Sequence, residues 1–303
     1  MRISDWLNKN THSLKGKKIA VTGATGGIGV YLCRYLLKLE ASLVLMDRNR
    51  EKSFDLIKKL NDEFPNAEIH HITTDLSNFS SVKSATEQLI KEDVDIFIHN
   101  AGAYSIPRYK CDTGYDNVFQ INFISPYYII CSLMPFLKAK NGRVIVTGSI
   151  AHRYSKSDIN DIDFSLKKQS SLVYGNAKRY LMFSLYELFK DEKQVTLSVV
   201  HPGITFTGIT NHYPKLIFAI IKNPMKIIFM NPRKACLSTV LGVFKDTYYH
   251  TWIGPKFFDI WGFPALKTLK INPEESKKIG ITAEKIYKEL NGEQNREYKT
   301  FSF

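Results

Sequence analysis

Residues 18–29 read KIAVTGATGGIG, a short β-branched run that passes into a glycine-rich turn and then into a helical pattern. Glycine permits backbone angles that a side chain forbids, and it lets main-chain N–H groups approach a pyrophosphate at a helix N-terminus. Gly23, Gly27 and Gly29 are spaced G-x-x-x-G-x-G, which differs from the dinucleotide fingerprint G-x-G-x-x-G. After the first strand of a βαβ unit, such a turn still favours dinucleotide binding.

The segments around this turn alternate between short apolar runs and longer helical patterns through the first 200 residues. Most of the short runs are β-branched with few polar interruptions, as expected of strands buried on both faces. The strands expected are residues 18–22, 42–46, 68–73, 94–99, 143–147 and 196–200. The helices expected are residues 28–39, 49–64, 78–91, 113–138 and 172–191. This alternation predicts an α/β fold, a doubly wound parallel sheet with helices on both faces.

The whole chain, residues 1–303, is expected to form a single domain, because no internal repeat, low-complexity tract or linker divides it. Residues 208–303 would form a C-terminal elaboration, with a last strand near 250–255 and a helix over 274–290. Four large aromatic residues of this part are expected in the core: Trp252, Phe257, Phe258 and Trp261. By sequence, no stretch reaches the length of a bilayer-spanning helix.

The composition is that of a globular chain with an excess of basic residues. There are 42 Lys plus Arg against 29 Asp plus Glu, a formal net charge of +13. Residues 215–303 hold 15 basic and 8 acidic residues, a net +7, so the excess is denser toward the C-terminus. Such a charge fits nucleic acid, an anionic membrane surface, an anionic ligand or a well-solvated surface. No nucleic-acid-binding motif accompanies it, so we expect no nucleic-acid partner.

The four cysteines form no C-x-x-C pair and no Cys/His cluster at zinc spacing; they are Cys33, Cys111, Cys131 and Cys236. We therefore expect free thiols in a reducing compartment and no metal site. Residues 1–18 lack the apolar run of a secretory signal. These features favour a cytoplasmic protein, and peripheral contact with a membrane stays open.

The end of the second expected strand bears on the choice of cofactor. Asp47 would accept hydrogen bonds from the adenosine ribose hydroxyls, which selects NAD. Arg48 would pair with the 2′-phosphate of NADP. Because Asp47 comes directly at the strand end, we favour NAD, with NADP and a simple solvated charge pair as the alternatives.

Tyr174 and Lys178 are four residues apart within a helical pattern, so they share one face of the helix. An ammonium near a phenol favours the phenolate and lowers the phenol pKa. The pair would therefore move a proton to or from an alcohol. Ser149 follows the fifth strand, at the carboxyl edge of the sheet where ligands of open α/β sheets bind. Its hydroxyl could hydrogen-bond a substrate carbonyl as that becomes an alkoxide.

At this point the sequence resembles the short-chain dehydrogenase/reductase family, with the Rossmann fold. The matching motifs occur in order between residues 18 and 207: TGATGGIG at 22–29, Asp75, HNAG at 99–102, Asn122, Ser149, YGNAK at 174–178 and HPGITFT at 201–207. The motifs YGNAK and HPG are most similar to those of the branch that contains retinol dehydrogenases and related lipid or steroid reductases. The resemblance implies an NAD(P)-dependent oxidoreductase acting on CH–OH groups of an apolar alcohol or carbonyl substrate, and a homo-oligomer.

The resemblance also implies roles for individual residues. Tyr174 would be the acid/base, Ser149 would orient the substrate oxygen, and Lys178 would hold the nicotinamide ribose and depress the tyrosine pKa. Asn122 would hold a water that links Lys178 to solvent. The residues implied to bind the cofactor are Gly23, Thr25, Gly27, Ile28, Gly29, Asp47, Arg48, Asp75, Leu76, Asn100, Ala101, Gly102, Tyr174, Lys178, Pro202, Gly203, Thr205 and Thr207.

Two regions depart from the family pattern or extend it. Ser149 and Tyr174 are 25 residues apart, more than is usual, and the polar residues 151–171 would form a loop at the mouth of the site. We expect His152 in this loop to be solvated, with a contact to the substrate as the alternative. Residues 208–232 would cover the substrate as an apolar lid, pack on the sheet as a helix, or touch a membrane through Lys215, Lys222 and Lys226. A catalytically quiet dinucleotide-binding sensor or scaffold is the alternative to the enzyme.

Overall fold

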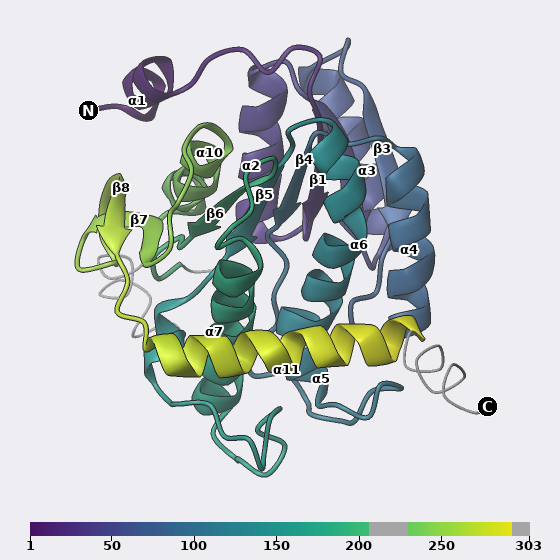
Figure 1. Ribbon diagram of the computed structural model, residues 1–303. Helices are drawn as coiled ribbons and strands as arrows, with labels where there is room; N and C mark the ends of the chain where they lie inside the picture. The colour runs from purple at the N-terminus through teal and green to yellow at the C-terminus, as the bar shows by residue number, and fades with distance from the viewer. Residues whose placement is uncertain (206–229, 293–303) are drawn as a thin grey trace, which may run out of the picture.

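Eight strands form one sheet in the order β3-β2-β1-β4-β5-β6-β7-β8 in this computed structural model, which describes residues 1–205 and 230–292 (Figure 1). The strands are β1 (Lys18–Thr22), β2 (Ser42–Asp47), β3 (Ile69–Thr73), β4 (Ile96–His99), β5 (Arg143–Thr147), β6 (Thr196–Val200), β7 (Thr251–Phe257) and β8 (Trp261–Thr268). The strands from β3 through to β7 pair in parallel. The doubly wound parallel sheet is thereby confirmed.

Helices cover both faces of the sheet, because each central strand is buried on both sides. Alternate residues of the strands point to opposite layers: Ala20 belongs to one apolar cluster, while Ile19 and Val21 belong to the other. The first layer holds α4 (Phe79–Lys91), α5 (Asn117–Phe119), α6 (Ser125–Ala139), α7 (Ser170–Leu188) and α11 (Pro273–Asn291). The second holds α1 (Ile3–Asn10), α2 (Gly27–Lys38), α3 (Arg50–Glu63) and α10 (Leu237–Phe244), with α9 (Pro232–Ala235) beside α2.

The helix predicted over residues 113–138 runs from Asn117 to Ala139 in three parts, α5, the π-helical turn η1 (Gln120–Ile124) and α6. Within the described residues it is the one helix that is long and apolar enough to cross a membrane. The sequence alone indicates no stretch of this length. Most of its apolar window, 78%, is buried inside the protein. This burial is typical of the core helix of a globular protein.

The C-terminal part differs most from the sequence expectation. The strand expected near 250–255 exists as β7, but β8 follows it and pairs with it antiparallel. The run WGFPALKT carries a glycine and a proline and shows no clear alternation, so its pattern did not indicate a strand. Trp252 is buried as predicted, whereas Phe257, Phe258 and Trp261 are exposed because they stand at the turn between the two strands. Residues 208–229 of the expected lid lie outside the described residues.

Helix α11, predicted over 274–290, lies across α7 and α6 (Figure 1). Its first turn carries Glu275, whose carboxylate accepts hydrogen bonds from Arg179 of α7 and from the backbone N–H and hydroxyl of Ser157. The Arg179 and Glu275 side chains are both mostly buried. Glu275 therefore ties three segments together: the C-terminal helix, the helix of Tyr174 and the loop over residues 151–171.

We expect Glu275→Gln to lower the free energy of unfolding by about 3 kcal/mol, because it leaves the Arg179 guanidinium buried without its anion. Urea denaturation at neutral pH measures the change. The matched control is Glu284→Gln on the same helix, whose ion pair with Lys288 is exposed and should change stability by about 0.5 kcal/mol or less. Equal effects of the two substitutions would contradict the prediction.

Candidate cofactor and catalytic site

The glycine turn after β1 is held against the end of β4. Gly23 has φ +68°, and a Cβ there would lie 2.8 Å from the Cα of Ala101, so only glycine fits. The Asn100 amide donates to the carbonyl oxygens of Thr22 and Gly23 at 3.2 and 3.0 Å. In return, Thr22 Oγ1 accepts from the N–H groups of Asn100 and Ala101. Asn100 and Ala101, both expected along the cofactor, thus also shape the turn that would cradle it.

The N-terminus of α2 is open to an anion. Gly26 caps the helix without a side-chain hydrogen bond, and Gly26 and Gly27 are exposed, while Ile28 is half-buried. Gly29 is buried, and a Cβ there would lie 2.2 Å from the carbonyl oxygen of Gly23, so the helix start packs directly on the turn. Unpaired N–H groups and the helix dipole make this a place for phosphate oxygens.

Asp47 and Arg48 are placed differently at the end of β2. The Asp47 carboxylate is buried, and its Oδ1 accepts hydrogen bonds from the backbone N–H and hydroxyl of Thr25. Its Oδ2 is buried without a hydrogen-bond partner among the described residues. Burial raises the pKa of this carboxyl group, against the hydrogen bonds from Thr25. Arg48 is exposed. The buried orphan oxygen is the kind of acceptor that a ribose hydroxyl would satisfy.

Asp75 and Leu76 follow β3 at the same edge of the sheet. Asp75 Oδ1 accepts from the backbone N–H and the hydroxyl of Ser77, at 2.9 and 2.7 Å. Leu76 is buried, and its carbonyl oxygen accepts from the Ser125 hydroxyl at 2.7 Å. This turn is thereby attached to the start of α6.

Lys178 and Tyr174 meet on α7 beside β5. The Lys178 ammonium lies 5.8 Å from the centre of the Tyr174 ring and donates to the Thr147 carbonyl oxygen at 2.8 Å. Tyr174 is half-buried, and Lys178 is only 1% exposed. Gly175 lets α7 approach the turn after Ser149, since a Cβ there would lie 2.3 Å from the Ala151 carbonyl oxygen.

Ser149 is brought to Tyr174 across 25 residues of sequence. It caps the short 3₁₀ helix η2 (Ile150–Arg153), and its Oγ accepts from the Ala151 N–H at 3.2 Å. The Ser149 hydroxyl also lies near enough to the Tyr174 phenol to lower its pKa. The structure therefore places Ser149, Tyr174 and Lys178 together at the carboxyl edge of the sheet, beside the glycine turn.

The pKa values of this trio differ from the sequence expectation. Burial lowers the pKa of Lys178 to about 7. Burial raises the pKa of Tyr174 to about 12, a rise that the Ser149 hydroxyl opposes and Tyr104 increases. Tyr174 thus does not have the depressed pKa that was expected from Lys178. The reason is that both groups have lost water, and desolvation favours the neutral form of each.

Asn122 lies in the π-helical turn η1, where it is fully buried. Its Oδ1 accepts from the Ala103 N–H at 3.2 Å, and its Nδ2 donates to the carbonyl oxygens of Ala103 and Val118 at 2.9 and 2.8 Å. Gly102 leaves space between them, as a Cβ there would lie 3.0 Å from Asn122 Oδ1 and 3.6 Å from the Lys178 ammonium. Asn122 therefore fixes the backbone beside Lys178.

Two residues that lie against Tyr174 and Ser149 were missed or misjudged from the sequence. Tyr104 places its ring edge-on to Tyr174, with ring centres 5.3 Å apart, and no pattern around it had indicated this. His152, expected to be solvated, is 1% exposed, and its Nδ1 lies 2.6 Å from the Ser149 carbonyl oxygen. It is buried because Phe183 and Trp252 surround it, and burial lowers its pKa to about 4.

The segment after β6 continues this edge of the sheet. Pro202 is half-buried, Gly203 has φ +82°, and Thr205 is buried and bridges to Met230. Thr207 lies outside the described residues. The described residues contain no cluster of three or more His, Cys, Asp or Glu able to hold a metal ion.

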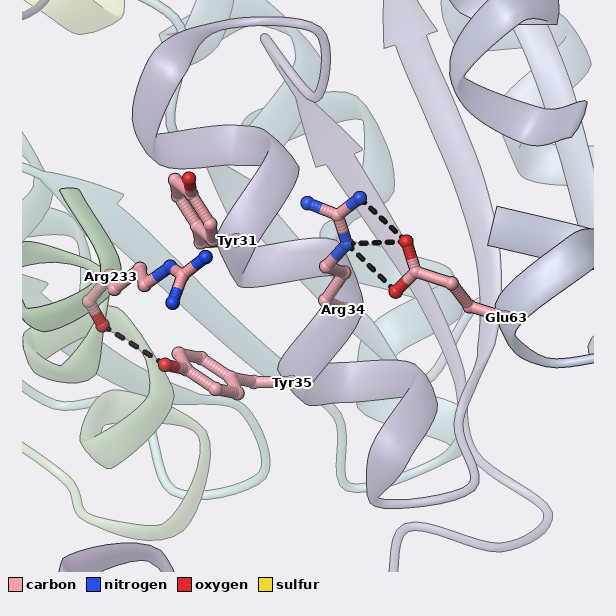
Figure 2. Close-up of a pocket in the computed structure, with 5 residues that line it drawn as sticks. All are labelled: Tyr31, Arg34, Tyr35, Glu63 and Arg233. Atoms are coloured by element: carbon pink, nitrogen blue, oxygen red, sulfur yellow. Dashed lines mark hydrogen bonds and ion pairs between the residues drawn. The ribbon is translucent and has the colours of Figure 1, made fainter. Parts of the chain in front are cut away.

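A separate cavity of about 400 Å³ lies on the outer side of α2. Figure 2 shows its lining residues, with Arg34 paired to Glu63, and the Tyr35 hydroxyl donating to the Arg233 carbonyl oxygen. Arg34 and Arg233 both approach the Tyr31 ring, at 5.8 and 5.2 Å. None of the residues predicted for cofactor binding or chemistry lines this cavity.

Comparisons with known proteins agree with the fold and with the family resemblance. The family described as short chain dehydrogenase matches residues 17–160. Retinol dehydrogenase 13 of Mus musculus is 28% identical over 206 residues, which cover 66% of this chain and 62% of that protein. An uncharacterized protein from Mycobacterium paratuberculosis has a TM-score of 0.70 at 18% identity, covering 93% of this chain and 96% of that one. The Pseudomonas aeruginosa RhlG/NADP complex has a TM-score of 0.58 at 23% identity, covering 78% and 91%.

The lowered pKa of Lys178 predicts a stability that rises with pH. Between pH 7 and its ordinary pKa of 10.5, the unfolded chain binds the lysine proton and the folded chain does not. Raising the pH therefore stabilises the fold, by up to about 1 kcal/mol per pH unit. Urea denaturation between pH 6.5 and pH 8.5, roughly the start of that window, measures the slope. In Lys178→Met this part of the slope should vanish, and equal slopes in both proteins would contradict the prediction.

Proposed function

We propose, from the premise that the chain belongs to the short-chain dehydrogenase/reductase family, that it is an NAD(P)-dependent oxidoreductase. The reaction would transfer a hydride between nicotinamide and an apolar alcohol or carbonyl compound. The observation that carries the proposal is the meeting of Ser149, Tyr174 and Lys178 beside the glycine turn. Ser149 comes from the turn after β5, whereas Tyr174 and Lys178 come from α7, and together they place a hydroxyl, a phenol and an amine where they could act on one oxygen atom.

The residues around the glycine turn fit a dinucleotide. The exposed N-terminus of α2 would hold the pyrophosphate, and the orphan Oδ2 of Asp47 would accept from the adenosine ribose. Gly102 would leave room for the nicotinamide ribose beside Lys178. The NADP named in the RhlG complex supports a nicotinamide cofactor of either kind. Bound there, NAD or NADP supplies the site of hydride donation or acceptance.

The chain's own groups would manage the oxygen and its proton. The Ser149 hydroxyl would hydrogen-bond the substrate oxygen and hold it near Tyr174. In alcohol oxidation the Tyr174 oxygen takes the hydroxyl proton as the C–H hydride leaves, and in carbonyl reduction it gives that proton back. A phenol with a raised pKa stays protonated at neutral pH, so the form needed for carbonyl reduction predominates and the phenolate that would accept a proton is scarce. Alcohol oxidation therefore requires Lys178 to be charged, and polar groups of a bound cofactor would favour that form.

The surroundings of Tyr174 support an apolar substrate. Tyr104 meets its ring edge-on, and Ile106, Phe164 and Leu172 form an apolar cluster around it. Phe164 belongs to the loop over residues 151–171, which Arg108 fixes by donating to the Phe164 carbonyl oxygen and to Asp116. The long spacing between Ser149 and Tyr174 would thus supply a wall of the substrate site. A homo-oligomer and a cytoplasmic location, with or without membrane contact, complete the proposal.

We expect Tyr174→Phe to lower kcat by a factor of about 10³ while cofactor affinity changes little. The substitution removes only the proton-carrying oxygen, and the ring still packs on Tyr104. Turnover of a panel of apolar carbonyls with NADH and NADPH, together with a fluorescence titration of each cofactor, measures both effects. Wild-type-like turnover in the variant would rule out the assignment of the acid/base. Tight cofactor binding without turnover in the wild-type protein would favour the sensor or scaffold instead.

We expect NADH to bind more tightly than NADPH, by about tenfold or more, because a 2′-phosphate would face the buried carboxylate of Asp47. Asp47→Ser should reduce this preference, while Arg48→Ala should leave NADH affinity unchanged, since Arg48 is exposed. The dissociation constants of the two reduced cofactors for the three proteins provide the measurement. Tighter binding of NADPH, lost in Arg48→Ala, would instead make Arg48 the selecting residue.

A further inference from the structure

The turn between β7 and β8 displays three aromatic side chains to solvent. Phe258 is 82% exposed, Phe257 is 55% exposed and Trp261 is 39% exposed. We call these three residues the aromatic tip. The other two tryptophans, Trp6 and Trp252, are buried in the two apolar layers. Exposed aromatic rings grouped on one turn mark an interaction site far more often than rings scattered singly over a surface.

The backbone of the aromatic tip is in a costly conformation. Phe258 has φ +54° and Asp259 has φ +59°, in the left-handed region. Asparagine and glycine adopt this region readily, whereas a bulky residue such as phenylalanine rarely does. A strained backbone that presents an apolar side chain to water has no explanation in the stability of the isolated fold.

The turn is also held rigidly. The Asp259 carboxylate pairs with Lys267 at 2.6 Å and with Arg153 at 3.2 Å, and its carbonyl oxygen lies 3.0 Å from Nε2 of His201. His201 in turn stacks on the buried Trp252 ring. The strained conformation is therefore imposed by surrounding groups, and the aromatic tip keeps a fixed direction relative to the sheet.

We propose that the aromatic tip inserts into the interface of an anionic lipid bilayer. The tip is a convex turn and not a groove, which suits insertion between lipids better than enclosure of a peptide. Tryptophan and phenylalanine are the side chains that favour the boundary between headgroups and acyl chains. Lys256 lies beside the tip, with its ammonium 5.7 Å from the Phe257 ring. The net +7 of residues 215–303 adds long-range attraction to negative headgroups.

The position of the aromatic tip links this surface to the catalytic edge of the sheet. A Cβ on Gly203 would lie 2.9 Å from the Ile260 carbonyl oxygen, so the turn packs directly on the segment after β6. Arg153, which pairs with Asp259, belongs to the short helix that Ser149 caps. Insertion of the tip would thus hold the carboxyl edge of the sheet close to the bilayer. The proposal does not depend on which reaction the site performs.

The test compares the full chain with Phe258→Asn in co-sedimentation with phosphatidylcholine vesicles, with and without phosphatidylserine. Asparagine tolerates the left-handed backbone, so the variant should unfold at the same or a higher temperature than the wild type. Removing the most exposed ring should lower the vesicle partition coefficient by about tenfold. Ile281→Asn, on the exposed face of α11, is the matched control and should bind vesicles like the wild type.

Tryptophan fluorescence gives an independent readout. Trp261 should shift to shorter wavelength on vesicles containing phosphatidylserine, and Trp261→Phe should remove the shift while binding persists. The proposal is overturned if the wild type does not bind anionic vesicles at low salt, or if Phe258→Asn binds them equally well. A change of oligomeric state in Phe258→Asn, with vesicle binding unchanged, would assign the tip to a contact between copies of the chain. Turnover on a soluble carbonyl should be the same in wild type and Phe258→Asn, which separates failure of this proposal from failure of the proposed function.

Discussion

A lysine ammonium without water is costly, and the arrangement of the carboxyl edge of the sheet follows from placing Lys178 there. The Thr147 carbonyl oxygen accepts a hydrogen bond from the Lys178 ammonium, and burial lowers the pKa of the amine to about 7. Because Gly102 has no side chain, the space beside the Lys178 ammonium stays open on one side. Asn122 fixes the neighbouring backbone at Ala103. The site thus holds an amine whose charged form a polar ligand beside it would favour. Burial of Lys178 disfavours its charged form, and a polar ligand that restores hydrogen bonds to the ammonium would offset this cost. The same burial that destabilises the charged lysine would therefore favour binding of the ligand.

Local sequence patterns predicted the features that depend on neighbouring residues, namely the strands and the turns at their ends. The β-branched runs became strands β1 to β6, and the glycine turn, Asp47 and Ser149 reached one edge because parallel strands end there. Tyr174 and Lys178 lie beside them on α7. The failures concern groups whose state depends on distant segments. His152 is buried by Phe183 and Trp252, and the Tyr174 pKa responds to burial that no local pattern reveals. Likewise, the exposure of Phe258 depends on the hairpin with β8, a strand interrupted by glycine and proline.

Three arginines explain why the polar residues between Ser149 and Tyr174 form an ordered wall. Arg108 attaches them to the segment before α5, Arg153 attaches them to the β7–β8 turn, and Arg179 attaches them to α11 through Glu275 and the His152 carbonyl oxygen. Each guanidinium has several donors in a fixed plane, so one side chain can join two or three segments. A polar composition therefore did not mean a solvated loop.

The last strand also determines how the sheet ends. Pro255 and Pro264 face each other across β7 and β8, and the register is irregular between Pro255 and Phe257. Proline lacks an N–H group, so the β7–β8 pair has two facing positions that cannot donate a ladder hydrogen bond. Edges with prolines and irregular register are poor templates for strands of another chain. The sheet is consequently protected against growth by strand addition, which lets the chain expose an aromatic turn at this end without inviting fibrous self-association.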